Sequence, residues 1–292
     1  MRPLPNWRSL LYVPATEERF IAKAHERGAD AIILDLEDAV APSAKAAARA
    51  GLAAAVPRVR RAGATGRAAD VCVRINRPLG LALADIDAAV AAGADALVLT
   101  KLLGPDHVRL LAEQVTAAEA AYGATHGRTL LIGLVETAAA VPRMEAIAGA
   151  DPRMVALGAG GEDLATDLEM KPSADALYLP KMLCVLAARA AGILPLGFIG
   201  TVAGLDDPDG YRAMLRRSRA MGFACASCVH PSQVAVINEE YGGRPEDLAQ
   251  ARRIVAAFEA GLAAGIGAVS LEGRMIDAPI AQRAQRLIAR AR

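Results

Sequence analysis

The stretch AIILDLEDAV, from Ala31 to Val40, opens with aliphatic residues that do not alternate with polar ones. A parallel strand covered by helices on both faces has this near-continuous apolar pattern. Three carboxylates follow closely, Asp35, Glu37 and Asp38. Burying an unpaired carboxylate is strongly unfavourable, so the stretch predicts a buried strand whose end faces cations or a ligand.

Seven further runs of this kind occur along the chain, with alanine-rich amphipathic stretches between them. The eight expected strands are Ser9–Pro14, Ala31–Glu37, Val71–Asn76, Ala96–Lys101, Leu130–Glu136, Met154–Gly160, Leu194–Gly200 and Ala224–His230. Eight strand-plus-helix repeats over about 240 residues have the length and rhythm of a TIM (β/α)8 barrel. A doubly wound open sheet is the rival architecture.

Helices are expected over Glu17–Arg27, Ser43–Arg61, Asp106–Tyr122 and Pro208–Met221. After the eighth strand, further helices are expected over Ser232–Tyr241, from Pro245 to about Ala264, and at the C-terminus. These extra helices have no place in a ring of eight repeats. We therefore expect a barrel over residues 1–242 and a C-terminal helical extension over 243–292, which packs on the barrel or on a neighbouring subunit.

The composition bounds the partners of the chain. Its 292 residues carry 33 Lys plus Arg against 32 Asp plus Glu. This balance gives no basic surface for nucleic acid or an anionic membrane. The chain has no long apolar run and no signal-like N-terminus, so a cytoplasmic location is expected. Four cysteines in a chain of this size suit reduced thiols better than a disulfide framework. Cys225 and Cys228 would point to opposite faces of one strand and could not easily bind one metal ion.

Polar residues gather where the expected strands end. Glu37 and Asp38 end the second strand, Glu136 the fifth, and Asp163 follows the sixth. In a barrel these ends share one face, which carries the active site. Converging carboxylates repel one another unless a cation lies among them. Hard oxygen ligands without a histidine cluster favour Mg2+, and Glu136 with Asp163 is the natural pair.

Two cationic residues end the neighbouring strands. The planar fork of Arg74 suits a substrate carboxylate, and an alternative role is to tie down the loop that carries Glu37 and Asp38. Lys101 is either a Schiff-base lysine or a partner for the acidic residues. A metal ion already acts as an electron sink, which favours the second role.

Taken together, the motifs resemble those of the citrate lyase beta subunit family, within the HpcH/HpaI aldolase and citrate lyase superfamily. They occur in the same order and span nearly the whole chain: RSLLYVPA, LDLEDAV, VRIN, LIGLVETA, GAGGEDLATDL, GFACASCVHPSQV and MIDAPIAQRAQRL. The resemblance implies a TIM barrel that cleaves a C–C bond of a β-hydroxyacyl-CoA to acetyl-CoA and a 2-oxo acid. Citramalyl-CoA, malyl-CoA and citryl-CoA are the candidate substrates.

The resemblance also implies roles for individual residues. Glu136 and Asp163 would ligate Mg2+, Arg74 would bind the substrate carboxylate, and Glu37 with Asp38 would orient water and Arg74. Asp277, in MIDAP, matches an acid/base aspartate that relatives supply from an adjacent subunit of a trimer. The resemblance thus implies a homotrimer or a multiple of it.

Two departures from the family pattern bear on the substrate. Gly197 stands where the family usually has an aspartate, and Cys225–Ala226 stand where it usually has Gly-Lys. The sequence leaves open which acyl-CoA is cleaved, whether other lyase subunits are required, and what Asp35 and Lys101 do. Two further possibilities are a class II aldolase that acts on a free 2-oxo acid without CoA, and a catalytically silent ligand-binding paralogue.

Overall fold

The computed structural model describes residues 3–290 except 64–65 and 201–206. Internal contacts divide the chain into two compact units, Met1–Ile237 and Asn238–Arg292, and the division falls within helix α9 (Pro231–Gly242). Each unit is described by itself. No helix among the described residues has the length and hydropathy needed to cross a membrane.

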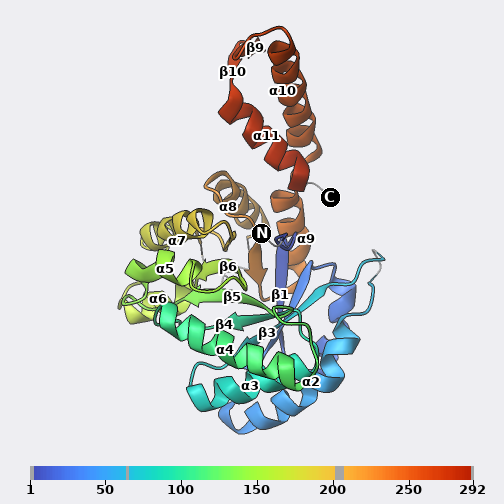
Figure 1. Ribbon diagram of the computed structural model, residues 1–292, viewed down its shortest axis with the longest axis vertical. Coiled ribbons are helices and arrows are strands. Elements are labelled where there is room, and N and C mark those ends of the chain that lie inside the picture. Colours follow the sequence, from blue (N-terminus) through green and yellow to red (C-terminus); the bar gives the residue numbers. More distant parts are fainter. Residues whose placement is uncertain (1–2, 64–65, 201–206, 291–292) are drawn as a thin grey trace. The chain divides into compact units, whose positions relative to one another are not determined.

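The first unit is a parallel barrel with helices outside its strands (Figure 1). Its strands are β1 (Ser9–Pro14), β2 (Ala31–Asp35), β3 (Asp70–Ile75), β4 (Ala96–Leu99), β5 (Leu130–Val135), β6 (Met154–Ala159), β7 (Leu194–Leu196) and β8 (Ala226–Cys228). They pair in chain order, and β1 pairs in parallel with β8. A parallel bridge between Leu196 and Cys225 closes the ring. The TIM barrel is confirmed, and the open sheet is excluded because both edge strands are paired.

The interior of the barrel is filled by every second residue of its strands. Leu10, Ala31, Ile33, Cys72, Val98, Ile132 and Leu134 belong to one buried cluster. The same alternation continues toward the carboxyl ends of the strands and reaches Tyr12, Asp35 and Arg74. The apolar core and the polar site are therefore successive layers of one barrel interior.

Most strands end before the predicted limit, and β2 shows the reason. The Asp35 carboxylate accepts hydrogen bonds from the backbone N–H groups of Glu37 (2.8 Å) and Ala39 (3.3 Å). Such side-chain bonds to the following backbone compete with the sheet ladder and turn the chain. Glu37 consequently lies in the loop after the strand.

The helices and turns of the first unit alternate with its strands. They are α1 (Glu18–Ile21), η1 (Ala24–Arg27), η2 (Pro42–Ala44), α2 (Lys45–Val59), α3 (Leu79–Ala91), α4 (Pro105–Ala121), η3 (Val141–Arg143), α5 (Met144–Ala148), α6 (Gly161–Asp167), α7 (Tyr178–Ala190) and α8 (Pro208–Ala220). The single helix expected over 17–27 is wrong. Lys23, with φ of −109°, separates α1 from the short 3-10 turn η1.

The second unit continues from α9 with α10 (Pro245–Ala263), the hairpin β9 (Val269–Leu271) and β10 (Arg274–Ile276), and α11 (Ala278–Arg290). Phe258, Ile276 and Ala281 form its small core. The helices were expected and the hairpin was not. Its turn residues Glu272 and Gly273 have φ of 53° and 75°, as a two-residue hairpin turn with positive φ at both positions requires.

Candidate active site

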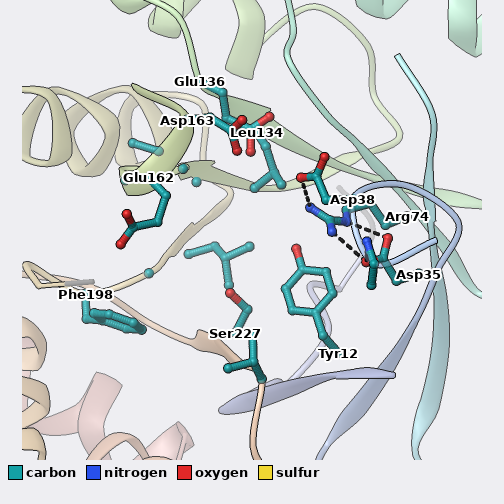
Figure 2. A pocket seen from close by; sticks show the side chains of 18 of the residues that line it. Tyr12, Asp35, Asp38, Arg74, Leu134, Glu136, Glu162, Asp163, Phe198 and Ser227 are labelled. Carbon is teal, nitrogen blue, oxygen red and sulfur yellow. Dashed lines mark hydrogen bonds and ion pairs between the residues drawn. The ribbon is translucent and has the colours of Figure 1, made fainter. Parts of the chain in front are cut away.

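A cavity of about 510 Å3 opens at the carboxyl ends of the strands in the first unit (Figure 2). Polar side chains from the ends of six strands and from helix α7 line it: Tyr12, Asp35, Asp38, Arg74, Glu136, Glu162, Asp163, Lys181 and Ser227. Active sites of (β/α)8 enzymes lie at this face, because only the loops that follow the strands reach it. The cavity also has an apolar side made by Leu134, Leu196 and Phe198.

Asp35 and Arg74 form the innermost polar contact of the cavity. The guanidinium donates from Nε to Asp35 Oδ1 at 2.7 Å and from Nη2 to Oδ2 at 2.6 Å. The guanidinium carbon lies 4.9 Å from the centre of the Tyr12 ring. A two-point ion pair fixes the plane of the guanidinium as well as its position. Asp35, whose role the sequence left open, is thus the main partner of Arg74.

The remaining side of Arg74 faces the acidic loop after β2. Its Nη1 atom lies 3.0 Å from Glu37 Oε2 and 3.3 Å from Asp38 Oδ2. The role of tying down this loop is therefore real. Three carboxylates therefore hold the single guanidinium of Arg74 in place.

Lys101 is the second cation of the acidic loop. Its Nζ atom lies 2.5 Å from Glu37 Oε1, 3.3 Å from Asp38 Oδ1 and 3.4 Å from Asp163 Oδ1. Partial burial acts to lower the pKa of Lys101, but these carboxylates outweigh it and raise the pKa. A permanently protonated amine is a poor nucleophile, so the geometry supports the ion-pair role over the Schiff base.

The pKa values of the two acids in the loop, Glu37 and Asp38, are shifted in opposite directions. Burial raises the pKa of Glu37, aided by its hydrogen bond with Asp38 and opposed by Lys101. Burial also acts to raise the pKa of Asp38, but the hydrogen bond with Glu37 and the charges of Arg74 and Lys101 lower it. As the pH falls, Glu37 is therefore expected to take up a proton before Asp38 does.

Glu136 and Asp163 follow the adjacent strands β5 and β6 and lie beside Lys101, near Asp38 (Figure 2). Burial, together with the charge of Asp163, raises the pKa of Glu136 to about 7. The backbone N–H of Lys101 acts in the opposite direction by donating to Glu136 Oε2 at 2.6 Å. Lys101 makes this contact in a left-handed conformation, with φ of 48°. Gly160 keeps the space open, because a Cβ there would lie 2.5 Å from Glu136 Oε1.

This pair suits a magnesium ion. In the described part of the chain no three His, Cys, Asp or Glu side chains are grouped as a metal cluster. Mg2+ typically takes one or two protein carboxylates and completes its shell with substrate oxygens and water. Two hard carboxylates that repel each other in a partly buried cavity meet that requirement, because a bound cation would relieve their repulsion.

Other residues considered from the sequence lie elsewhere. Asp277 belongs to the second unit, where its Oδ1 accepts from the Ile280 N–H at 3.2 Å and caps α11. His230 is exposed and its Nδ1 lies 2.7 Å from Ser232 Oγ. Cys225 and Cys228 are buried free thiols, as expected.

Two cavity residues were missed by sequence reasoning. Tyr12 is in β1, and Figure 2 shows its hydroxyl directed among the labelled side chains. Burial raises the pKa of Tyr12, so the group is a neutral hydrogen-bond donor. Lys181 is the lone cation at the start of the apolar helix α7, a signal that deserved weight because lysine is almost never buried without a partner.

The two departures from the family pattern, Gly197 and Cys225–Ala226, lie next to Leu196 on the apolar side of the cavity. Gly197 lines the cavity with φ of 132°, and a Cβ there would lie 3.4 Å from the Phe223 ring. Ala226 is buried in β8 beside Cys225. Both positions contribute backbone and no charge.

Together, the closed (β/α)8 ring and the cavity of carboxylates and a held arginine at the carboxyl ends of its strands define a barrel enzyme. The chain belongs to the HpcH/HpaI aldolase/citrate lyase family, whose sequence model matches residues 8–231.

Relatives match over nearly their full length. The citrate lyase subunit beta of Leuconostoc mesenteroides subsp. cremoris is 31% identical over 287 residues, which are 96% of this chain and 92% of the relative. The L-malyl-CoA/beta-methylmalyl-CoA lyase of Cereibacter sphaeroides is 30% identical over 310 residues, covering 98% and 95%. The crystal structure of the protein CitE of Mycobacterium tuberculosis in complex with magnesium, acetoacetate and coenzyme A has a TM-score of 0.76 at 32% identity and covers 97% of each chain.

Proposed function

We propose that this chain is a Mg2+-dependent acyl-CoA lyase. It cleaves a C–C bond of a β-hydroxyacyl-CoA to acetyl-CoA and a 2-oxo acid. The observation that carries the proposal is the Glu136–Asp163 pair, which lies in one cavity with Arg74 and Tyr12. The lyase names of the relatives, and the magnesium and coenzyme A bound by CitE, support the same reaction class.

In the proposed reaction, the bond between the methylene carbon next to the thioester and the hydroxyl-bearing carbon breaks. The hydroxyl loses its proton and its carbon becomes the carbonyl of the 2-oxo acid. The electron pair of the broken bond forms the thioester enolate, which gains a proton on carbon to give acetyl-CoA. One proton leaves and one is added, so cleavage needs no oxidant, reductant or net acid.

The residues of this chain would divide the work. Glu136 and Asp163 would hold Mg2+, which when bound supplies positive charge to the oxygens of the hydroxy acid and of the product. Arg74 and the neutral Tyr12 hydroxyl would orient the substrate, with Glu37 and Asp38 holding Arg74 and ordering water. Asp277 would move the proton at the enolate carbon, a task for a positioned carboxyl.

The proposal includes an oligomer. Asp277 belongs to the second unit, and the resemblance that suggests its role places it in the cavity of an adjacent subunit. We propose a homotrimer or a multiple of it. Sedimentation equilibrium of the purified chain measures this directly, and a monomer with full activity would contradict it.

Release of 2-oxo acid, followed as its phenylhydrazone, tests the reaction. Citramalyl-, malyl- and citryl-CoA are each supplied with Mg2+ and with excess EDTA. We expect release from at least one ester that stops with EDTA and returns when Mg2+ is restored. Pyruvate release from a CoA-free hydroxy-oxo acid would instead show an aldolase, and ligand binding without any turnover would show a silent paralogue.

A further inference from the structure

Lys181 is a buried cation on the apolar side of the cavity. Lys181 is 5% exposed, and its Nζ atom donates to the carbonyl oxygens of Phe198 at 2.6 Å and Gly200 at 2.5 Å. The ammonium also lies 5.3 Å from the centre of the Phe198 ring. An ammonium has three donors, so these two carbonyls leave one for a ligand. Lys181 lines the cavity, where such a ligand would bind.

The surroundings of the Lys181 charge differ from those of Arg74 and Lys101. Arg74 and Lys101 each face several carboxylates at 3.4 Å or less. Within the described part of the chain, no carboxylate lies within ion-pair distance of Lys181. Burial consequently lowers its pKa to about 8, which the more distant charge of Glu162 only partly offsets. An anionic oxygen beside Nζ would complete its contacts and stabilise its charge.

The backbone places this cation close to the carboxylate pair. Gly160 and Gly161 are consecutive residues, and a Cβ on Gly160 would touch the Glu136 carboxylate. A Cβ on Gly161 would lie 3.5 Å from Lys181 Nζ. The carboxylates proposed to hold the metal and the Lys181 ammonium therefore flank one two-residue turn. A small acid whose oxygens are held at the Glu136–Asp163 pair could therefore place a second charged group near the Lys181 ammonium.

The three candidate substrates differ in whether the 2-oxo acid that they release carries a second carboxylate. Cleavage of citryl-CoA gives oxaloacetate, which carries a second carboxylate. Citramalyl-CoA gives pyruvate and malyl-CoA gives glyoxylate, and neither carries one. Among the described residues Lys181 has no carboxylate partner, and Phe198 lies beside it. A buried charge is costly when unpaired, which favours the substrate that brings a carboxylate to this cation.

We propose that Lys181 is a specificity-determining residue that binds the second carboxylate of a four-carbon 2-oxo dicarboxylic acid, so that this chain prefers citryl-CoA. The inference rests on the proposed lyase function and sharpens its substrate. Lys181 thus binds the second carboxylate of the acid. Arg74, already held by three carboxylates, orients the reacting part of the substrate.

The test compares kcat and KM for the three esters in the wild-type chain, Lys181→Met and Lys181→Arg. Methionine keeps the length without charge, and arginine keeps the charge. We expect wild-type kcat/KM to be highest for citryl-CoA. Lys181→Met should lower that value by about 10- to 100-fold, mainly through KM, as expected for loss of a charge-assisted hydrogen bond, and by a clearly smaller factor for the other two esters. Lys181→Arg should recover part of the preference.

Controls separate specificity from folding. Lys171 is exposed and does not line the cavity, so Lys171→Met should leave all three esters unaffected. An equal loss on all three esters in Lys181→Met would mean that Lys181 only holds the Phe198–Gly200 carbonyls, which would overturn the proposal. So would a wild-type enzyme that prefers citramalyl- or malyl-CoA.

Equilibrium binding separates failure of this inference from failure of the lyase function. Calorimetry with fresh oxaloacetate and with pyruvate, each with Mg2+, needs no turnover. If the wild-type chain cleaves none of the esters but binds oxaloacetate more tightly than Lys181→Met does, with pyruvate less affected, the lyase function fails and the inference stands. Equal oxaloacetate binding by the two proteins would overturn the inference alone.

Discussion

Arg74 holds Asp35 by two parallel hydrogen bonds, from Nε to Oδ1 at 2.7 Å and from Nη2 to Oδ2 at 2.6 Å, across the neighbouring strands β3 and β2. Asp35 is 1% exposed, and each of its oxygens accepts a hydrogen bond from the guanidinium. The contact links the barrel core to the cavity, because both side chains stand directly above the apolar interior. It determines the orientation in which Arg74 faces a substrate.

Asp35→Asn should destabilise the protein and weaken catalysis together. Removing one partner of a buried two-point ion pair costs about 3 kcal/mol, because the remaining charge loses its best-placed counterion. Urea unfolding measures the loss, and KM for the preferred CoA ester should rise. Asp38→Asn is the control, because the Asp38 side chain is 53% exposed and its loss should cost less than about 1 kcal/mol. Equal stability of the two variants would contradict a structural role for the Asp35 pair.

Glu136→Gln and Asp163→Asn should each abolish Mg2+-dependent cleavage without unfolding the barrel. An amide keeps the size of the side chain but removes the negative charge that a hard cation needs. We expect a loss of at least about 100-fold in kcat and weaker Mg2+ binding by calorimetry. Glu162→Gln is the matched control, since this exposed acid lines the same cavity. Normal Mg2+ affinity in both ligand variants would contradict the proposed site.

The raised pKa of Glu136 predicts a pH effect in the metal-free protein. The folded state holds the Glu136 proton up to about pH 7, whereas the unfolded chain releases it near 4.5. The folded state therefore binds more protons between these values, so its stability falls as the pH rises through them. In EDTA, the free energy of unfolding of the wild type relative to Glu136→Gln should decrease from about pH 4.5 to pH 7. A difference independent of pH would disprove the assignment.

Lys101 should form no covalent intermediate. Its three carboxylate partners raise its pKa and keep the amine protonated. Borohydride added with pyruvate or oxaloacetate should give no adduct on the peptide that contains Lys101, as read by mass spectrometry. Lys101→Met should reduce kcat only partially, because the backbone N–H to Glu136 remains. An adduct at Lys101 would overturn the ion-pair role.

Two substitutions of Asp277 separate its role as the cap of helix α11 from its proposed role in cleavage. Asparagine caps a helix about as well as aspartate, so Asp277→Asn should keep the Ile280 contact and the stability while losing cleavage. Asp277→Ala should lose cleavage and also about 1 kcal/mol of stability. Thermal unfolding and 2-oxo acid release measure the two effects independently.

Mixed oligomers test where Asp277 acts. Asp277→Asn and Glu136→Gln chains, each inactive alone, should regain activity after they are unfolded and refolded together if the aspartate serves a neighbouring subunit. Complementation fails if each cavity uses its own Asp277.

The strands, and the face of the barrel that carries the site, could be predicted from the sequence because both depend on which residues follow one another along the chain. Near-continuous apolar runs identified all eight strands of the barrel, and β1 has the predicted bounds. A closed ring of parallel strands brings every carboxyl end to one face, so the positions of Arg74, Glu136 and Asp163 in the chain sufficed to place them together. The family motifs added a reaction class to that placement.

Tertiary structure alone decided which charges meet. Asp35 and Arg74 are 39 residues apart, and their pairing depends on the register of β2 against β3. Lys101 reaches Glu37 across 64 residues because its backbone takes a left-handed turn after β4. The sequence shows Lys181 as a single cation at the start of the apolar helix α7, but only the folded barrel shows its burial against Phe198, with no carboxylate within ion-pair distance among the described residues. Periodicity determines the face on which a side chain lies, whereas its partner depends on strand register and loop conformation, which local sequence does not encode.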